Sequence, residues 1–456
     1  MRILRTSGRL TAAATSLLIA AAGGGAVTAS AATAGGSPGG AAAPRLALGG
    51  LRAAEHPAAA SALVPGSFLF GVYCTSRHNC WAVGYTTGAH GFLNQALHWN
   101  GTDWKPVSVP NPGGRGSATV SPSNELFAVR CRASTDCWAV GQYTTGTNKP
   151  FRNEALHWNG SKWKIVATPQ PGGGGSSDQS ELYDVTCTSS ANCWAVGDYG
   201  RFDTFVFDPV RFRTQILHWN GTRWSQVHSP NPAGTVTGHQ NSLISVRCLS
   251  SVSCFAVGDF GTTGSSVVLH NMALHWNGSK WKLQHTPDPA GFSATHVNLL
   301  ESLGCETATL CFAAGEYGTG WPVVTASRDQ ILRWNGAKWY AVGTPKLSGA
   351  SSPQDSALFG TVCVTARNCW TVGSYTNTAN AEVNQALHWT GKKWFQVRTP
   401  NPGGSTTSSG YNTLISARCT STRNCWAVGY SESGSTGSDE ILHWNGTKWS
   451  VYHLAG

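Results

Sequence analysis

The sequence has no long apolar run in its body, few charged side chains and little acid. Beyond the N-terminal segment no stretch reaches 18 apolar residues, which excludes a transmembrane helix there. The 22 acidic residues do not recur at one repeat position, and no nucleophile triad is marked. The formal net charge of +10 comes from basic residues scattered singly, which does not predict a nucleic-acid partner. An enzyme is therefore the less favoured class, and no cofactor or metal is expected.

The N-terminus is typical of an exported protein. Three arginines precede a short apolar stretch from Leu10 to Ala22, and Ala29-Ser30-Ala31 fits a small-residue cleavage site. An Ala-, Gly- and Pro-rich segment without periodicity follows, which suits a flexible spacer. We predict a secreted, extracellular protein with a signal peptide at residues 1–31, a spacer at 32–66 and a folded domain at 67–456.

The folded domain is repetitive. Its fourteen cysteines form seven pairs with five residues between the members, and the pairs recur every 56 to 61 residues. Around each pair the same phrase returns: a Leu five residues before the first Cys, then Cys-Trp-Ala-Val-Gly, then Ala-Leu-His-Trp-Asn-Gly. Self-similarity at this period indicates a repeat architecture. The repeats start near residues 69, 126, 182, 243, 300, 358 and 414.

Each repeat reads as four short extended runs separated by turn signals. In the third repeat the runs are Leu182 to Cys187, Cys193 to Tyr199, Gln215 to Trp219 and Trp224 to Val227. Asn220-Gly221 joins the last two, and this dipeptide predicts a tight type I′ turn. Four antiparallel strands repeated seven times predict an all-β, seven-bladed β-propeller. A solenoid is the alternative, but it needs end caps that the sequence does not show.

The cysteine pairs predict one disulfide within each blade. The first Cys ends one strand and the second begins the next, so the two face each other across a hairpin. Metal ligation is the alternative, but each pair would lack two ligands, and an exported protein favours disulfides. The predicted bonds are Cys74–Cys80, Cys131–Cys137, Cys187–Cys193, Cys248–Cys254, Cys305–Cys311, Cys363–Cys369 and Cys419–Cys425.

The recurrent phrases Leu-x-x-Val-x-Cys, Trp-Ala-Val-Gly and Leu-His-Trp-Asn-Gly-Thr-Lys-Trp resemble a blade of the Asp-box propellers. That superfamily includes sialidase-like proteins and photosystem assembly factors, and its box forms the turn between the third and fourth strands, where Trp444 to Trp449 fall here. The resemblance covers about residues 67 to 456 and implies a fold but no activity, because the box is a scaffold element. Asn replaces the usual Asp, and His replaces the opening Ser or Thr. The chain also resembles uncharacterised secreted actinobacterial proteins that repeat Cys-Trp-Ala-Val-Gly.

Two recurrent side chains invite functional interpretations. A histidine precedes the third-strand Trp in six repeats, but that strand lies roughly 10 Å outside the innermost one, so the rings diverge and a structural role is favoured over metal binding. The tryptophans suit a lectin, yet Trp99, Trp104 and their counterparts are expected to pack one blade on the next. The histidines are His98, His157, His218, His275, His388 and His443.

Three arginines share the position just before the first Cys of a pair. Arg130, Arg247 and Arg418 fall there in the second, fourth and seventh repeats, on the innermost strand. They either line the central channel or cap strand ends, and the second interpretation is favoured.

Binding residues are expected on the face where the loops differ between repeats, because binding loops on a rigid scaffold vary. The richest loop runs from Arg201 to Arg213 and combines four Phe with three Arg, residue types that are common at interfaces. The alternative is that these aromatics fold back over their own blade. The predicted binding residues are Arg201, Phe202, Phe205, Phe207, Arg211, Phe212, Arg213, Trp321, Phe151 and Arg152.

The sequence thus favours a non-catalytic extracellular binding module that recognises a glycan or a protein through its variable loops. A secreted carbohydrate-active hydrolase or lyase, with its site at the channel mouth, is the first alternative. A purely structural surface protein is the second. The chain is expected to act as a monomer, with an unknown glycan or extracellular protein as partner and without nucleic acid or a membrane span.

Overall fold

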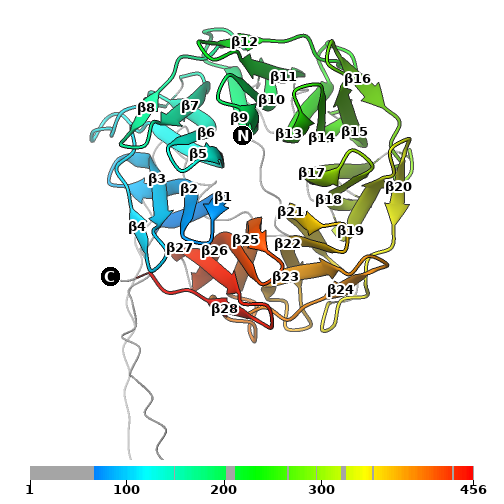
Figure 1. Cartoon of the computed structure of the whole chain (residues 1–456). Helices are drawn as coiled ribbons and strands as arrows, with labels where there is room; N and C mark the ends of the chain where they lie inside the picture. Colours follow the sequence, from blue (N-terminus) through cyan, green and yellow to red (C-terminus); the bar gives the residue numbers. More distant parts are fainter. Residues whose placement is uncertain are drawn as a thin grey trace, which may run out of the picture.

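The computed structural model describes residues 66–147, 149–201, 211–263, 267–293, 295–319, 325–351, 354–433 and 436–454. All regular structure in these ranges is β, with strands β1 to β28 in chain order. The strands form a ring of four-strand units around a central axis, which confirms the all-β prediction and matches a propeller (Figure 1). Within the same ranges, no helix has the length and apolar character needed to cross a lipid bilayer.

Each unit runs outward from the axis, and we name it by its innermost strand (Figure 1). The innermost strands are β1 (Ser67–Ser76), β5 (Ser123–Ala133), β9 (Asp178–Ser189), β13 (His239–Ser250), β17 (His296–Thr307), β21 (Ser356–Thr365) and β25 (Gly410–Ser421). The second strands are β2 (Asn79–Gly88), β6 (Asp136–Thr144), β10 (Asn192–Arg201), β14 (Ser253–Thr262), β18 (Leu310–Thr319), β22 (Asn368–Thr376) and β26 (Asn424–Ser433). The third strands are β3 (Gly91–Trp99), β7 (Arg152–Trp158), β11 (Arg211–Trp219), β15 (Val268–Trp276), β19 (Thr325–Trp334), β23 (Glu382–Trp389) and β27 (Thr436–Trp444). The short outermost strands are β4 (Trp104–Pro106), β8 (Trp163–Ile165), β12 (Trp224–Gln226), β16 (Trp281–Gln284), β20 (Trp339–Val342), β24 (Trp394–Gln396) and β28 (Trp449–Val451).

Hydrogen bonding divides the strands into four four-stranded sheets and one twelve-stranded sheet, β9 to β20. Within every unit the pairing is antiparallel, as predicted. Single parallel bridges, Arg211 with His239 and Leu269 with Val297, join the units of the larger sheet. The number of sheets therefore differs from the predicted number of blades, because these bridges fuse neighbouring units.

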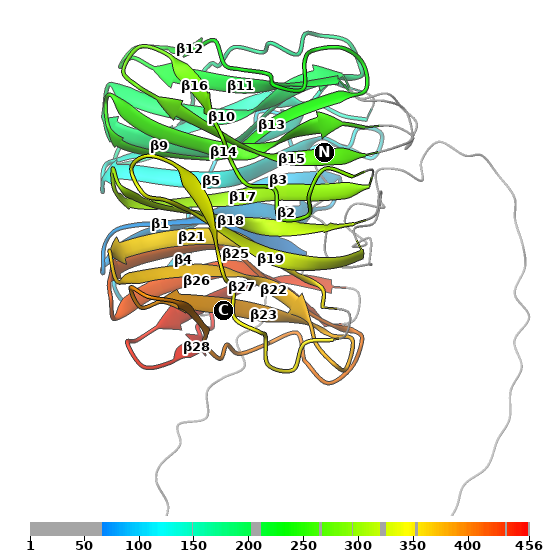
Figure 2. The ribbon, with the colours of Figure 1, turned by 90° about the vertical axis from the view of Figure 1, so that its right-hand side faces the viewer.

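The disulfides are those that the spacing predicts. Cys131 and Cys137 are direct cross-strand partners in the β5–β6 hairpin, and all seven predicted bonds are present. In each unit the bond closes the turn between the first two strands. Because the third-to-fourth turn lies at the same end, that end of the ring is the rigid face. The opposite end, where β3 begins at Gly91 and β7 at Arg152, is the variable face. Figure 2 shows the ring from the side, with the strands running between the two faces.

Tryptophans pack neighbouring units together, as predicted. Trp138 of the β5 unit is 1% exposed, and its ring lies 4.8 Å from Trp219 and 5.0 Å from Trp224 of the next unit. Trp99 and Trp104 receive Trp426 in the same way, at 4.9 and 5.4 Å. Each second strand is thus apolar on both faces, because it lies between two units.

The turns between third and fourth strands are not the predicted type I′ turns. Asn100 begins a loop of four residues between β3 and β4, and only Gly101 has a positive φ, of 103°. The Asn100 side-chain oxygen accepts hydrogen bonds from the amides of Thr102 and Asp103, each at 2.9 Å. The asparagine therefore recurs as a side-chain cap of the loop and not for left-handed backbone.

Candidate functional site

Every innermost strand has a β-bulge directly after the recurrent leucine. In β1 the pairing passes from Leu69 to Gly71, so that Phe70 has no partner on β2, and β5 skips Phe127 in the same way. A bulge redirects the extra side chain, and here that side chain lines a cavity on the axis. The bulge residues are Phe70, Phe127, Tyr183, Ile244, Glu301, Phe359 and Ile415.

The glycine that ends each Ala-Val-Gly phrase accommodates the bulge. A Cβ on Gly141 would lie 1.9 Å from the carbonyl oxygen of Glu125, and one on Gly84 would lie 1.8 Å from that of Phe68. No side chain fits at such a distance. The shape of the neighbouring innermost strand, which forms the cavity wall, therefore requires glycine at this position.

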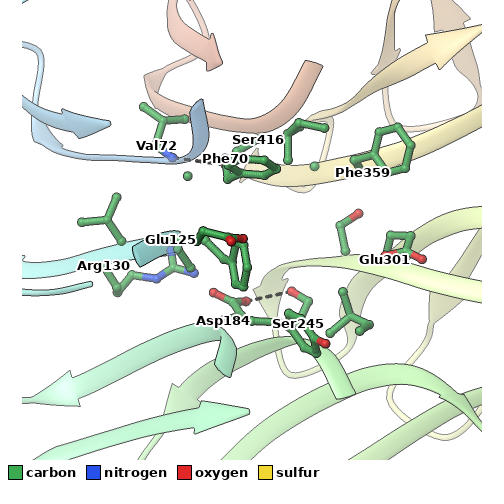
Figure 3. Close-up of a pocket in the computed structure, with 18 of the residues that line it drawn as sticks. Phe70, Val72, Glu125, Arg130, Asp184, Ser245, Glu301, Phe359 and Ser416 are labelled. Carbon is green, nitrogen blue, oxygen red and sulfur yellow. Dashed lines mark hydrogen bonds between the residues drawn. The ribbon is translucent and has the colours of Figure 1, made fainter. Parts of the chain in front are cut away.

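The inward side chains enclose a cavity of about 280 Å³ at the centre of the ring (Figure 3). One part of its wall is aromatic. The Phe127 ring lies 5.8 Å from Phe70 on one side and 5.8 Å from Tyr183 on the other, and Phe70 lies 5.6 Å from Tyr85. Phe68, 5.1 Å from Tyr85, completes what we call the aromatic belt: Phe68, Phe70, Tyr85, Phe127 and Tyr183.

The cavity extends to the variable face. Phe92 and Phe151 also line it, and they lie beside the starts of β3 and β7. Apolar side chains at a concave mouth are typical of small-molecule sites. The loops predicted to differ between blades therefore surround the entrance to this cavity.

Two carboxyl groups share the wall beside the belt. Glu125 accepts hydrogen bonds from the Ser123 hydroxyl and from Gln142 Nε2, the latter at 3.1 Å. Glu181 accepts one from the Tyr183 hydroxyl at 2.6 Å. Burial raises the pKa of Glu125 above its ordinary value, and the nearby charge of Glu181 adds to the effect. Glu125 thus retains its proton to higher pH than an ordinary glutamate does.

A third acid, Asp184, joins two units. One of its oxygens accepts the Ser245 hydroxyl and the Val246 amide, each at 2.9 Å, and the other accepts its neighbouring Val185 amide at 2.8 Å (Figure 3). One oxygen therefore holds β9 against β13, and the other is occupied by an amide of β9 itself.

The end of the cavity nearest the disulfides, its floor, is basic. Arg130, Arg247 and Arg418 all line the cavity, so the favoured interpretation as strand-end caps is incomplete. The guanidinium carbons of Arg418 and Arg130 lie 4.2 and 4.7 Å from the Tyr73 ring centre. Burial alone would raise the pKa of Tyr73, but the three arginines outweigh it, and the pKa lies below its ordinary value.

The predicted binding residues do not gather at this cavity, except for Phe151. Arg152 is half-buried on β7, opposite Tyr143, and is not part of the lining. Arg201 pairs with Arg211 where β10 and β11 end at the variable face, and Phe212 and Arg213 follow on β11. Phe202, Phe205, Phe207 and Trp321 lie outside the described residues.

The recurrent histidines lie between strands of their own unit. His98 Nε2 is 2.5 Å from Asn79 Oδ1, and its ring lies 4.5 Å from that of Trp81. His218 repeats the arrangement with Asn192, at 2.6 Å, and Trp194. Burial lowers the pKa of both. Among the residues described, no three potential metal ligands lie together. These contacts are those of structural side chains.

The bulge residues and the belt were not singled out from the sequence. Strict alternation along a strand hides a bulge, since it assigns Phe127 and Val129 to one face. The available signal was indirect: the recurrent leucine is followed by a position that varies and is often aromatic, opposite a glycine that does not vary.

No protein-family model and no curated protein matches the sequence. Among solved structures, an ulvan lyase from a new family of polysaccharide lyases, bound to -[GlcA(1-4)Rha3S]-, is similar with a TM-score of 0.51 at 10% identity, over 87% of this chain and 97% of the lyase. The propeller domain of the trilobed protease from Pyrococcus furiosus gives 0.45 at 7% identity, over 84% and 97% of the two chains. The fucose-specific lectin from Aleuria aurantia gives 0.38 at 12% identity, over 85% and 95%. Likeness at such identity concerns the fold alone. A ring of four-stranded sheets is the propeller architecture, and the chain is a β-propeller protein.

Proposed function

We propose that this chain is a secreted, non-catalytic binding module that recognises a glycan at the central cavity and the surrounding variable face. The observation that supports this best is the aromatic belt. Aromatic faces bind the apolar faces of sugar rings, and the belt lies beside the hydrogen-bonding carboxyl groups of Glu125 and Glu181. The cavity volume of about 280 Å³ suits a terminal sugar or a short segment.

The proposal includes the organisation predicted from the sequence. Residues 1–31 are the export signal, residues 32–66 the spacer, and residues 67–456 a seven-bladed monomeric propeller. In this proposal the twelve-stranded sheet counts as three blades, since only single bridges join its units. The Asp-box relationship is proposed on the position of the Asn100 loop between third and fourth strands.

Replacing Phe127 with alanine is expected to weaken glycan binding about tenfold, because the central ring of the belt is lost. Screening the mature chain on an array of glycans and secreted proteins identifies the ligand, and titration of the best ligand gives the affinity. Phe395→Ala is the control, since Phe395 is 41% exposed on the outer strand β24. Equal binding by F127A and the native chain would remove the cavity as the site. A deletion of residues 202–212 tests the blade-three loop in the same assay.

The carboxyl pair supports a second candidate, a hydrolase or lyase. Glu125, with its raised pKa, has the character of a general acid, and the side chain of Glu181 lines the cavity with it. If the chain is catalytic, Glu125→Gln is expected to abolish release of reducing ends or unsaturated products from the bound polysaccharide while leaving the affinity unchanged. If it is a binding module, neither the native chain nor E125Q releases product. The aromatic cavity argues against a purely structural role.

A further inference from the structure

The floor of the cavity has an excess of positive charge. Arg130, Arg247 and Arg418 occupy one equivalent position, directly before the first cysteine of their units, and Tyr73 occupies it in β1. These residues follow the belt on the same strands. Glu125 at the mouth and Arg130 at the floor are five residues apart on β5, a separation of roughly 15 Å in extended chain.

Two of the guanidinium groups are held without a carboxylate. Arg418 donates from Nη2 to the Tyr73 hydroxyl at 3.1 Å, and Arg130 donates from Nε to the Val185 carbonyl at 3.3 Å. Both also stack on the Tyr73 ring. Each retains N–H donors that these contacts do not use, since a guanidinium has five. The Nε of Arg418 is buried and has no acceptor in the described part of the chain.

Arg247 has no hydrogen bond or ion pair to any residue that the structure describes, although it lines the cavity. Burial, and then the like charges of Arg130 and Arg418, lower its pKa well below the ordinary value. The acid whose charge acts on Arg247, Asp184, already accepts two hydrogen bonds from β13 and one from its own strand β9. An unpaired, half-buried guanidinium beside two like charges destabilises a fold, so this arrangement is explained if its partner is a ligand.

We propose that Arg130, Arg247 and Arg418 form an oxyanion site for the acid group, carboxylate or sulfate, of an acidic sugar. The inference rests on the proposed glycan-binding function and adds the substrate class. The acid group lies on the floor against the guanidinium donors, and the sugar ring lies in the aromatic belt. The hydroxyls of the next sugar along the glycan chain then reach Glu125 and Glu181 at the mouth. The acidic mouth and basic floor fit a ligand with an acid group at one end only.

The test uses the mature full-length chain and four probes in calorimetric titrations: uronate oligomers, sulfated oligomers without carboxylates, neutral oligomers, and sodium sulfate. We expect one of the two acidic oligomers to bind at least tenfold more tightly than the neutral oligomers, and which of them binds identifies the acid group. Arg247→Gln is expected to lower that affinity tenfold or more, because charge-assisted hydrogen bonds are lost. Arg132→Gln, an exposed arginine two residues along β5 from Arg130, is the control and is expected to have no effect.

Thermal stability separates a ligand site from a structural role. Without ligand, R247Q is expected to melt at the same temperature as the native chain or higher, because an unpaired, half-buried charge beside two like charges is removed. A lower melting temperature together with unchanged affinity would overturn the proposal. Binding of neutral and acidic oligomers with equal affinity would overturn the oxyanion site and leave glycan binding in place. Arg247-dependent binding of sulfate alone, with no sugar bound, would retain the site and overturn the glycan function.

Discussion

Replacing Trp426 with alanine is expected to lower the free energy of unfolding by about 3–5 kcal/mol, the usual effect of truncating a buried aromatic side chain. Trp426 is 2% exposed and belongs to the last unit. Its ring contacts Trp99 at 4.9 Å and Trp104 at 5.4 Å, both in the first unit, and Tyr452 at 5.6 Å. The substitution thus opens a cavity where the two ends of the ring meet.

The junction depends on side chains because no strand is shared across it. The sheets β1 to β4 and β25 to β28 are each built from one continuous segment, so β28 completes the last unit by itself. Hydrogen bonds also cross the junction: the Gly66 amide donates to the Gly437 carbonyl at 2.7 Å, and the Tyr452 hydroxyl donates to the Thr102 carbonyl at 3.1 Å. Side chains add further bonds between the two units, from Gln95 to Asp439 at 2.6 Å and from Arg418 to Tyr73 at 3.1 Å. Trp426 adds to these polar contacts a large buried apolar one.

Denaturant unfolding followed by tryptophan fluorescence measures the loss. Trp426→Phe is the matched control, since Phe255 and Phe312 occupy the equivalent position in two other units, buried at 1% and 0% exposure. We expect W426F to retain most of the stability. A W426A chain as stable as the native one would show that the ring does not depend on this contact.

Features fixed by local pattern could be predicted from the sequence. Cys131 and Cys137 bond because a hairpin places them in register, and Trp138 is buried because its strand is apolar on both faces. The bulge at Phe127 and the positions of the three arginines depend on how strands curve around the axis, which local pattern does not determine. The cavity therefore became visible only in three dimensions, although one predicted residue, Phe151, lines it.

The contacts of the acidic residues could not be predicted from local pattern either. They do not recur at a single position, yet several meet an amide of the neighbouring unit on the third strands. Asn271 and Gln330 form the purely amide version, with reciprocal hydrogen bonds of 2.8 and 2.9 Å between units. The versions that include an acid are Asn94 with Glu154, Gln385 with Asp329, Asn384 with Glu440, and Gln95 with Asp439. In each of these, one oxygen of the acid and one of the amide are buried without a partner in the described residues. Two facing acceptors lack a proton between them, and a protonated carboxyl supplies it.

Asp439 illustrates the consequence for stability. Burial raises its pKa from 3.8 to about 7, although hydrogen bonds from Gln95 and Ser67 act in the opposite direction. Between these two pH values the folded chain binds more protons than the unfolded chain, so stability falls as the pH rises through this window. At about 1.4 kcal/mol per pH unit, this carboxyl alone lowers the stability by roughly 4 kcal/mol by pH 8. Asp329, whose pKa rises to about 6, adds a smaller loss of the same sign.

Replacing Asp439 with asparagine is therefore expected to stabilise the fold by up to roughly 4 kcal/mol at pH 8 and to change little at pH 4. The new amide has the donor that Asp439 lacks when it is ionised, so it can form with Gln95 the reciprocal pair seen between Asn271 and Gln330. Denaturant unfolding at a series of pH values from 4 to 8 measures the effect. The free energy of unfolding of D439N should fall less steeply with pH than that of the native chain, but it should still fall because the other buried acids remain. Gln95→Glu is the opposite control, since it places a second carboxyl against Asp439 and should steepen the loss. If D439N were less stable than the native chain at every pH, Asp439 would have to be ionised in the folded protein, and the pairing of protonated acids with amides across the ring junction would be wrong.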